Sequence, residues 1–306
     1  MKVHLIIAGA MLVAGQAVGQ SIKLAGIDYA TYRQVAVKGS NTGQELAFRE
    51  FGVSVTVPVI ARQSGLLLLN GFRYAQLNAT SYKSPIFGQP EAKQTVHTLV
   101  YSLNVVKPLS TKWTLALGVM PTLASDFVKP LSGDDFRMQA VTLARYQVSE
   151  GVGLGGGVAY STRFGTQVLL PVIALSYRKK SFRLNTVLPA SLTAYFQSDN
   201  ERVKGGLRIR TAGSFIHIGE QFAAAPNIDK LSYSRITIGP ALEWKVAGPL
   251  VLELAAGITT RRRFDFINTD KTVLSADPQT GPFLNIGLSI APRLKGKTGE
   301  GMDMVF

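Results

Sequence analysis

Residues 95–127, TVHTLVYSLNVVKPLSTKWTLALGVMPTLASDF, carry the pattern that decides the fold. Residues 107–111, KPLST, interrupt this stretch and predict a tight turn, because proline cannot continue a strand ladder. Large apolar residues recur at every second position on both sides of the turn: Leu99, Tyr101, Leu103 and Val105 before it, and Trp113, Leu115, Leu117 and Val119 after it. A period of two on both arms predicts a β-hairpin.

The second face of this hairpin indicates where it lies. In a soluble sheet the solvent-facing side carries charges and long polar side chains. Here that side is mostly Thr, Ser, Asn, Gly and Ala, and neither arm contains a charged residue. An apolar band of about ten residues, backed by a small or polar face and closed by a short turn, is typical of a transmembrane β-barrel hairpin.

The alternation repeats along the chain. Further segments with this pattern are residues 51–60, 66–77, 138–148, 152–160, 167–177, 182–188, 191–197, 203–218, 232–246, 250–260 and 282–292. Long connections, at residues 78–94, 125–135, 219–230 and 261–280, mostly alternate with short ones, as extracellular loops alternate with periplasmic turns.

The number of strands must be even if both ends of the barrel lie in the periplasm. Counting residues 21–38 as a first strand gives fourteen, and merging the segments around Pro189 gives about twelve. The expected fold is therefore all-β, a single transmembrane antiparallel β-barrel of about 12–14 strands.

The first twenty residues, MKVHLIIAGAMLVAGQAVGQ, have the pattern of an export signal. Lys2 precedes the apolar residues 5–13, and the small residues Ala17 and Gly19 suit signal peptidase. We therefore expect a signal peptide at residues 1–19 and the barrel at residues 20–306; the alternative is a buried N-terminal helix. The chain has no cysteine, which excludes a lipoprotein anchor, disulfides and thiolate metal sites.

After this segment, no run reaches the roughly 18 apolar residues of a spanning helix, so an exported chain is either a barrel or a soluble periplasmic β-protein. The net charge of +14 favours an acidic partner. Export argues against nucleic acid, which leaves lipopolysaccharide phosphate or small anionic solutes in a basic pore. The expected location is the outer membrane, with its lipid and its assembly machinery as partners.

The segment KPLSTKWTLALGVMPTLASDF, with its V-x-K-P-L-S-x-K-W turn at residues 105–113, resembles a family of uncharacterised outer-membrane β-barrels of Gram-negative bacteria. Leu188-Pro189 before a short turn is a second point of similarity. The resemblance implies location and fold, and no activity. One departure is the end of the chain: Phe306 suits a terminal barrel strand, but residues 293–303 do not alternate and predict a flexible tail.

Charges concentrate on the inward face of the expected barrel. Parity places there the basic residues Arg73, Arg137, Arg145, Arg183, Lys204, Arg208, Arg210, Arg235, Lys245 and Arg261, and the acidic residues Glu50, Glu243 and Glu253. They cannot face lipid, where a midplane arginine costs about 2–4 kcal/mol. Two interpretations have equal weight: a lumen that favours anions, and a closed lumen in which arginines pair with Glu243, Glu253 and backbone groups.

The outer surface suggests two kinds of contact with the membrane. Arg261, Arg262 and Arg263 follow a strand and are expected to bind lipopolysaccharide phosphates, or to form a solvated loop base. Aromatic residues near strand ends predict interfacial girdles in preference to ligand stacking: Phe72, Tyr74, Tyr101, Trp113, Tyr160 and Trp244.

Nothing in the sequence indicates catalysis, a metal or a cofactor. The mature chain has two histidines, His97 and His217, which share the outward face near the outer rim, and no Gly-x-Ser-x-Gly motif is present. The expected protein is not an enzyme but a passive pore or small-solute channel with a basic, anion-favouring lumen. The alternative is a closed structural or surface-interaction barrel without transport.

Overall fold

The structure, a computed structural model, describes residues 22–61, 64–83, 90–219, 228–268 and 273–292. The expected signal peptide at residues 1–19, the expected flexible tail at residues 293–303 and Phe306 lie outside the described residues.

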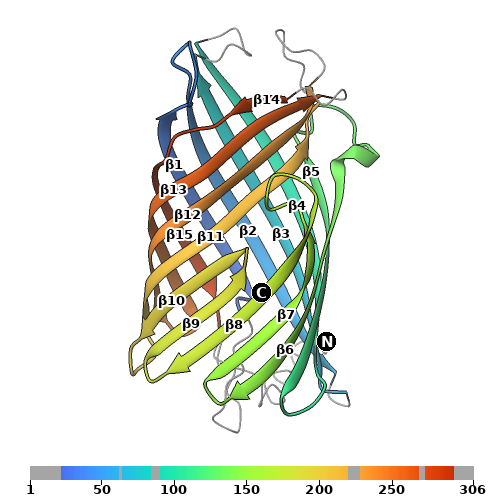
Figure 1. The fold of residues 1–306 in the computed structure, drawn as a ribbon, viewed down its shortest axis with the longest axis vertical. Coiled ribbons are helices and arrows are strands. Elements are labelled where there is room, and N and C mark those ends of the chain that lie inside the picture. The colour runs from blue at the N-terminus through green and yellow to red at the C-terminus, as the bar shows by residue number, and fades with distance from the viewer. Residues whose placement is uncertain (1–21, 62–63, 84–89, 220–227, 269–272, 293–306) are drawn as a thin grey trace, which may run out of the picture.

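Fourteen strands form a closed antiparallel barrel (Figure 1), which confirms the all-β prediction at the upper end of its range. The strands are β1 (Ala25–Ala36), β2 (Glu45–Ala61), β3 (Leu66–Tyr82), β4 (Glu91–Pro108), β5 (Trp113–Ser125), β6 (Phe136–Ser149), β7 (Val152–Ser161), β8 (Val168–Lys179), β9 (Phe182–Leu188), β10 (Ser191–Gln197), β11 (Val203–His217), β12 (Ile228–Ala247), β13 (Leu250–Asn268) and β15 (Gly281–Ile290). Strand β14 (Val273–Ala276) pairs with β13 alone, and a short 3-10 helix, η1 (Gly133–Asp135), precedes β6.

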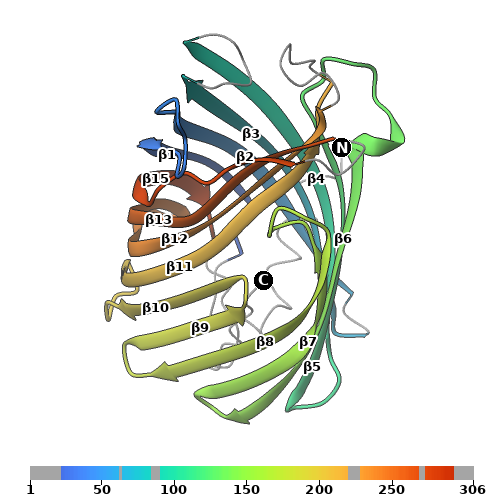
Figure 2. The ribbon, with the colours of Figure 1, turned by 45° about the horizontal axis from the view of Figure 1, so that its top comes forward.

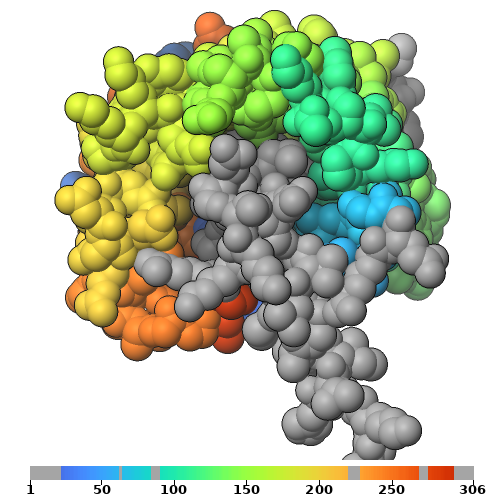
Figure 3. Space-filling model, turned by 90° about the horizontal axis from the view of Figure 1, so that it is seen from below, coloured from blue at the N-terminus to red at the C-terminus, as the bar shows by residue number. Residues whose placement is uncertain are grey.

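The barrel closes through β15, which pairs with β13 on one side and with β1 on the other. Both Ala25 and Leu250 lie opposite Ile290, so the first and last strands begin and end at one rim. Short hairpin turns gather at this turn rim, at the bottom of Figure 1, and the longer connections lie at the opposite loop rim. Seen from below, the coloured atoms of the wall surround the barrel axis (Figure 3).

The outer surface is apolar. Exposed side chains along the wall include Val55, Val57, Leu117, Val119, Leu154, Leu169, Ile173 and Ile286. Five of the six predicted girdle residues, all except Tyr74, are also exposed large hydrophobics. An outward apolar belt on a closed barrel is the surface that a lipid bilayer requires. Among the described residues, no helix is long and apolar enough to cross a membrane.

The loop-rim half of the interior is filled by a hydrophobic core, here named the outer seal. Its large members are Leu46, Phe48, Val96, Ile216, Ile218, Leu231, Tyr233, Phe264 and Phe266, each at most 2% exposed. The ring of Phe264 lies 5.2 Å from that of Phe48 and 5.2 Å from that of Phe266, centroid to centroid. In this conformation the lumen is therefore closed toward the loop rim.

Two short strands allow the wall to contract around the seal. Strands β9 and β10 have 7 residues each, and their hairpin turns at Pro189, which has no N–H with which to extend the ladder. Neither strand reaches the loop rim, and there β11 meets β5 directly, with His217 opposite Ser125. Strands β6 to β10 are thus left out of the wall at that height.

A buried carboxylate holds this contact together. Asp135 of η1 is 1% exposed; its Oδ1 lies 2.9 Å from Nδ1 of His217, and its Oδ2 accepts the backbone N–H of Ser132 at 2.6 Å. Burial opposes ionisation of Asp135, but hydrogen bonds from Ser125, Ser132 and His217 outweigh it and lower its pKa below the usual 3.8.

We expect Asp135→Asn to lower the free energy of unfolding by about 2–3 kcal/mol at pH 7, because charge-assisted bonds to a buried group are lost. A lowered carboxylate pKa stabilises the fold above its unfolded-state value, and this contribution disappears as the pH falls below 3.8. The difference from wild type should therefore shrink toward pH 3. Urea unfolding in lipid vesicles at several pH values measures it, and a constant difference across that range would contradict the assignment.

Candidate functional site: a cationic lumen

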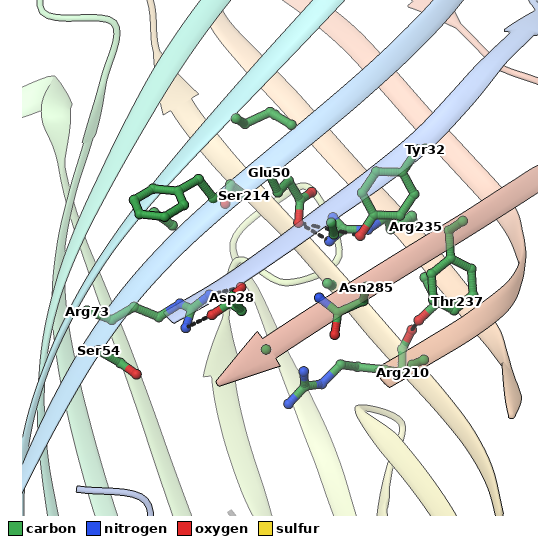
Figure 4. Close-up of a pocket in the computed structure, with 18 of the residues that line it drawn as sticks. Asp28, Tyr32, Glu50, Ser54, Arg73, Arg210, Ser214, Arg235, Thr237 and Asn285 are labelled. Atoms are coloured by element: carbon green, nitrogen blue, oxygen red, sulfur yellow. Dashed lines mark hydrogen bonds and ion pairs between the residues drawn. The ribbon is translucent and has the colours of Figure 1, made fainter. Parts of the chain in front are cut away.

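Below the outer seal lies a cavity of about 480 Å³, here named the lumen cavity (Figure 4). Its walls are β1 to β4, β11 to β13 and β15, together with Arg163 from the β7–β8 connection. Tyr32, Ile216, Tyr233 and Phe283 line it beside the seal, and Lys23, Glu253 and Ser289 line it toward the turn rim. The alternation of β-strands produces this site, because every second side chain must point inward.

The structure brings together six of the predicted lumen residues at this cavity: Glu50, Arg73, Arg208, Arg210, Arg235 and Glu253. Lys204 and Glu243 join the set through Arg208, whose guanidinium lies 3.5 Å from Glu243, while the Lys204 amine lies 3.6 Å from it.

The remaining predicted lumen residues do not line the lumen cavity. They are Arg137, Arg145, Arg183, Lys245 and Arg261. Arg145 donates a hydrogen bond to Ser176, and the guanidinium of Arg137 lies 5.1 Å from the ring centroid of Phe215.

Most charges at the cavity are neutralised in pairs. Arg73 forms a two-pronged contact with Asp28, at 2.9 and 3.0 Å. Lys23 lies 2.5 Å from Glu253, and Arg235 pairs with Glu50. The expected pairing of Glu243 with an arginine is present. Glu253 instead pairs with Lys23, which precedes β1 and was not among the predicted lumen residues.

Two arginines at the cavity, Arg163 and Arg210, do not belong to these ion pairs. Both side chains are exposed to the space of the cavity, and no carboxylate of the described residues lies within 4.0 Å of either. Arg73, Arg163 and Arg208 all act electrostatically on Arg210, and the Glu253 carboxylate, which makes no ion pair with it, acts on it in the opposite sense. Figure 4 shows Arg73 and Arg210 entering the cavity from different strands. Guanidinium groups gathered without acidic partners attract anions, and each can hold a carboxylate or phosphate through two parallel hydrogen bonds.

The predicted orientations of Arg261 and Arg262 are wrong, because a β-bulge lies at this point of β13. Arg261 and Arg262 of β13 both face Arg235 of β12, and Arg261 has a φ of 46°. The extra residue shifts the alternation by one position. Arg261, predicted inward, is therefore exposed; Arg262, predicted to contact lipopolysaccharide, is 3% exposed and lies 4.8 Å from the Phe48 ring centroid. Lipopolysaccharide contact stays a prediction for Arg261 and Arg263.

The histidines occupy structural positions. His97 Nδ1 lies 2.8 Å from the Tyr74 hydroxyl, and His217 bonds Asp135. The Ser125 hydroxyl also bonds Asp135 and accepts the Phe127 N–H, so its contacts serve the strand junction. No group of three or more His, Asp or Glu suited to a metal occurs among the residues that the structure describes.

Fold and site define a transmembrane β-barrel with an apolar exterior, a closed outer end and a cationic lumen, the class found in bacterial outer membranes. The chain belongs to the family described as "Domain of unknown function (DUF6268)", which matches residues 35–291. This confirms the resemblance to uncharacterised outer-membrane barrels.

Several solved structures are similar in fold. The COG4313 outer membrane channel from Pseudomonas putida F1 is 13% identical, with 90% of this chain and 97% of that chain covered at a TM-score of 0.43. The Pseudomonas putida toluene transporter TodX is 14% identical, with 89% of each chain covered at 0.37. The beta domain of the Bordetella autotransporter BrkA is 10% identical, with 87% and 98% covered at 0.39. No curated protein matches the chain.

Proposed function

We propose that this protein is an outer-membrane barrel that binds small anionic solutes in its lumen and passes them when the outer seal opens. The observation that carries the proposal is the pair Arg163 and Arg210, two exposed guanidinium groups in a cavity of about 480 Å³ that have no carboxylate partner among the described residues. Neighbouring arginines repel one another, and a bound anion would relieve that repulsion. Delivery to the membrane through a cleaved signal peptide belongs to the same proposal.

The second candidate is a closed barrel without transport, and the outer seal favours it. Its apolar side chains exclude water and ions from the loop-rim half of the interior. The same observation makes a permanently open pore a poor description of this conformation. Enzymatic activity is not part of the proposal, because Ser125 and His217 both direct their polar contacts to Asp135.

Sulfate tests the proposal directly. We expect saturable binding of sulfate to the refolded full chain, measured by calorimetry in dodecyl maltoside at constant ionic strength. Arg163→Gln with Arg210→Gln should weaken it at least tenfold, because both guanidinium groups are removed.

The matched control removes two positive charges at the turn rim instead. Lys179→Gln with Arg202→Gln changes exposed side chains outside the cavity, and sulfate binding should be retained. Equal loss in both double variants would mean that net charge alone attracts the anion, which would overturn the lumen site.

A further inference from the structure

The barrel wall is incomplete on one side of the lumen cavity. Strand β8 pairs with β9 only from Ile173 onward, which leaves residues 168–172 without a partner on that side. Strand β11 pairs with β10 only up to Arg210, and Thr211 bonds Pro189 and Ala190 of the turn, which leaves residues 212–216 without a described strand on that edge. We name the space between these two edges the wall slot; the strands that bound it diverge in Figure 2.

The lumen cavity reaches this slot. Its lining includes Ala212 and Ser214, which are on the inward face of β11, and also Thr211 and Gly213, which are on the outward face. The cavity therefore reaches the free edge of β11. A second cavity of about 600 Å³ shares Thr211 and Arg235 with it. Its apolar lining is Phe164, Pro189, Ile236 and Pro278, and its polar lining is Lys38, Ser234, Arg261, Arg262, Arg263, Asp277 and Thr280. The two cavities are therefore neighbours, separated by Thr211 and Arg235.

The β7–β8 connection, residues 162–167, lies over the slot. A Cβ on Gly213 would lie 2.5 Å from the carbonyl oxygen of Arg163, and one on Gly165 would lie 3.5 Å from the Cβ of Ser234. These contacts place the backbone of the connection against the outward face of β11 and β12. The side chain of Arg163 nevertheless lines the lumen cavity, so it passes the edge of β11 from outside to inside.

The slot opens at the depth of the hydrocarbon layer. Leu169, Ile173 and Leu188 beside it are 67%, 61% and 45% exposed on the lipid-facing surface. Unpaired strand edges do not persist against lipid unless protein covers them or they line a polar space. The slot thus lies between an apolar surface on one side and, on the other, two guanidinium groups that no carboxylate of the described part of the chain pairs with.

We propose that an anionic amphiphile, a single acidic group on a long apolar chain, enters through the wall slot and binds its acidic group between Arg163 and Arg210. The chain then passes the side chains of Phe164, Pro189 and Ile236, the apolar part of a second cavity that is otherwise polar. The seal closes the loop rim to such a molecule, whereas the slot faces the layer in which amphiphiles partition. This inference rests on the proposed function and names its substrate class and its route.

Binding of dansyl-labelled undecanoate to the refolded full chain, followed by fluorescence in dodecyl maltoside, tests the substrate class. We expect saturable binding that Arg163→Gln with Arg210→Gln weakens at least tenfold and that Lys179→Gln with Arg202→Gln leaves unchanged. The neutral dansyl-labelled undecanamide should bind at least tenfold more weakly. Sulfate binding without tighter binding of the undecanoate would overturn this inference and leave the proposed function standing; absence of both would overturn both.

An engineered disulfide tests the route. The chain has no cysteine, and the Cβ positions of residues 165 and 234 lie 3.5 Å apart, within reach of a disulfide. Gly165 has a φ of 82°, so a cysteine there is strained, and this strain is present in the oxidised and in the reduced protein alike. In Gly165→Cys with Ser234→Cys, oxidation should slow association of the undecanoate at least tenfold and leave sulfate binding unchanged, with the reduced protein as its own control. Equal association rates in both states would overturn entry through the slot.

The acidic group could be supplied by a free amphiphile or by a membrane lipid. Nanodiscs of phosphatidylglycerol and of phosphatidylcholine separate these sources. Displacement of the undecanoate by phosphatidylglycerol alone supports the proposal with a lipid as ligand, and retention in both supports a free amphiphile. Displacement by phosphatidylcholine to the same extent would overturn recognition of a net negative charge.

Discussion

Phe264→Ala is expected to lower the free energy of unfolding by about 3–5 kcal/mol, because it removes a ring from the middle of a packed core. Phe264 is 2% exposed and its ring contacts those of Phe48, Tyr233 and Phe266. No neighbouring side chain can fill the space without leaving its own packed position. The variant should therefore keep a void in the outer seal.

The same void should change conductance. In planar bilayers we expect Phe264→Ala to show current steps that wild type lacks, because water can enter the weakened seal. In a salt gradient these steps should favour anions, and adding Arg163→Gln with Arg210→Gln should abolish that preference. Comparing Phe264→Ala with the triple variant shows whether the outer seal blocks ions and whether the lumen arginines select anions.

Phe196→Ala is the matched control. Phe196 is 63% exposed on the outer surface of β10, so the same substitution leaves the seal intact. It should lower stability less and produce no steps. Steps of equal size in both variants, or none in a destabilised Phe264→Ala, would show that the seal is not the barrier to ions.

The wall of the barrel could be predicted from sequence because its signal is local. Alternation needs only neighbouring residues, so the strand segments, the even strand number and the inward position of Arg73, Arg208 and Arg210 follow from a period of two. Residues 21–38, counted as a strand only in the fourteen-strand alternative, contain β1, and Pro189 lies between two separate strands. Strands β12 and β13 extend farther than expected, into residues 228–231 and 261–268, since the alternation ends before the pairing does.

The closed outer end and half of the site depend on contacts that no local pattern contains. The bulge at Arg261 moves Arg262 inward. The alternation of apolar and polar residues does not predict the position of a bulge. Arg163 comes from a connection, which has no parity at all. Asp28 neutralises Arg73 across β2, a contact between strands that are not adjacent in the wall. The β5–β11 contact joins residues 92 positions apart, His217 and Ser125, through the shortness of β9 and β10.

Glu50→Gln should be the most destabilising change of a single charged group, at about 3–5 kcal/mol, because it leaves a buried guanidinium without a counter-charge. Arg235 is 8% exposed and lies 4.6 and 5.1 Å from the ring centroids of Tyr32 and Tyr233. Glu50 is its carboxylate partner. Arg262, itself 3% exposed, is close enough to Arg235 to repel it, so a neutral amide in place of the Glu50 carboxylate would leave two like charges in one enclosed site.

Two further variants make this prediction specific. Glu243→Gln breaks a more exposed pair, with Lys204 and Arg208 at 3.6 and 3.5 Å, and should lower the free energy of unfolding by less than about 1 kcal/mol. Arg235→Met in the Glu50→Gln background removes the buried guanidinium that has lost its counter-charge, and it should restore much of the lost stability. Urea unfolding in vesicles measures these variants together with Arg235→Met alone. If the double variant is as unstable as the sum of the single changes, Glu50 and Arg235 do not act as a pair, and the polar layer between seal and cavity must be held by the tyrosines instead.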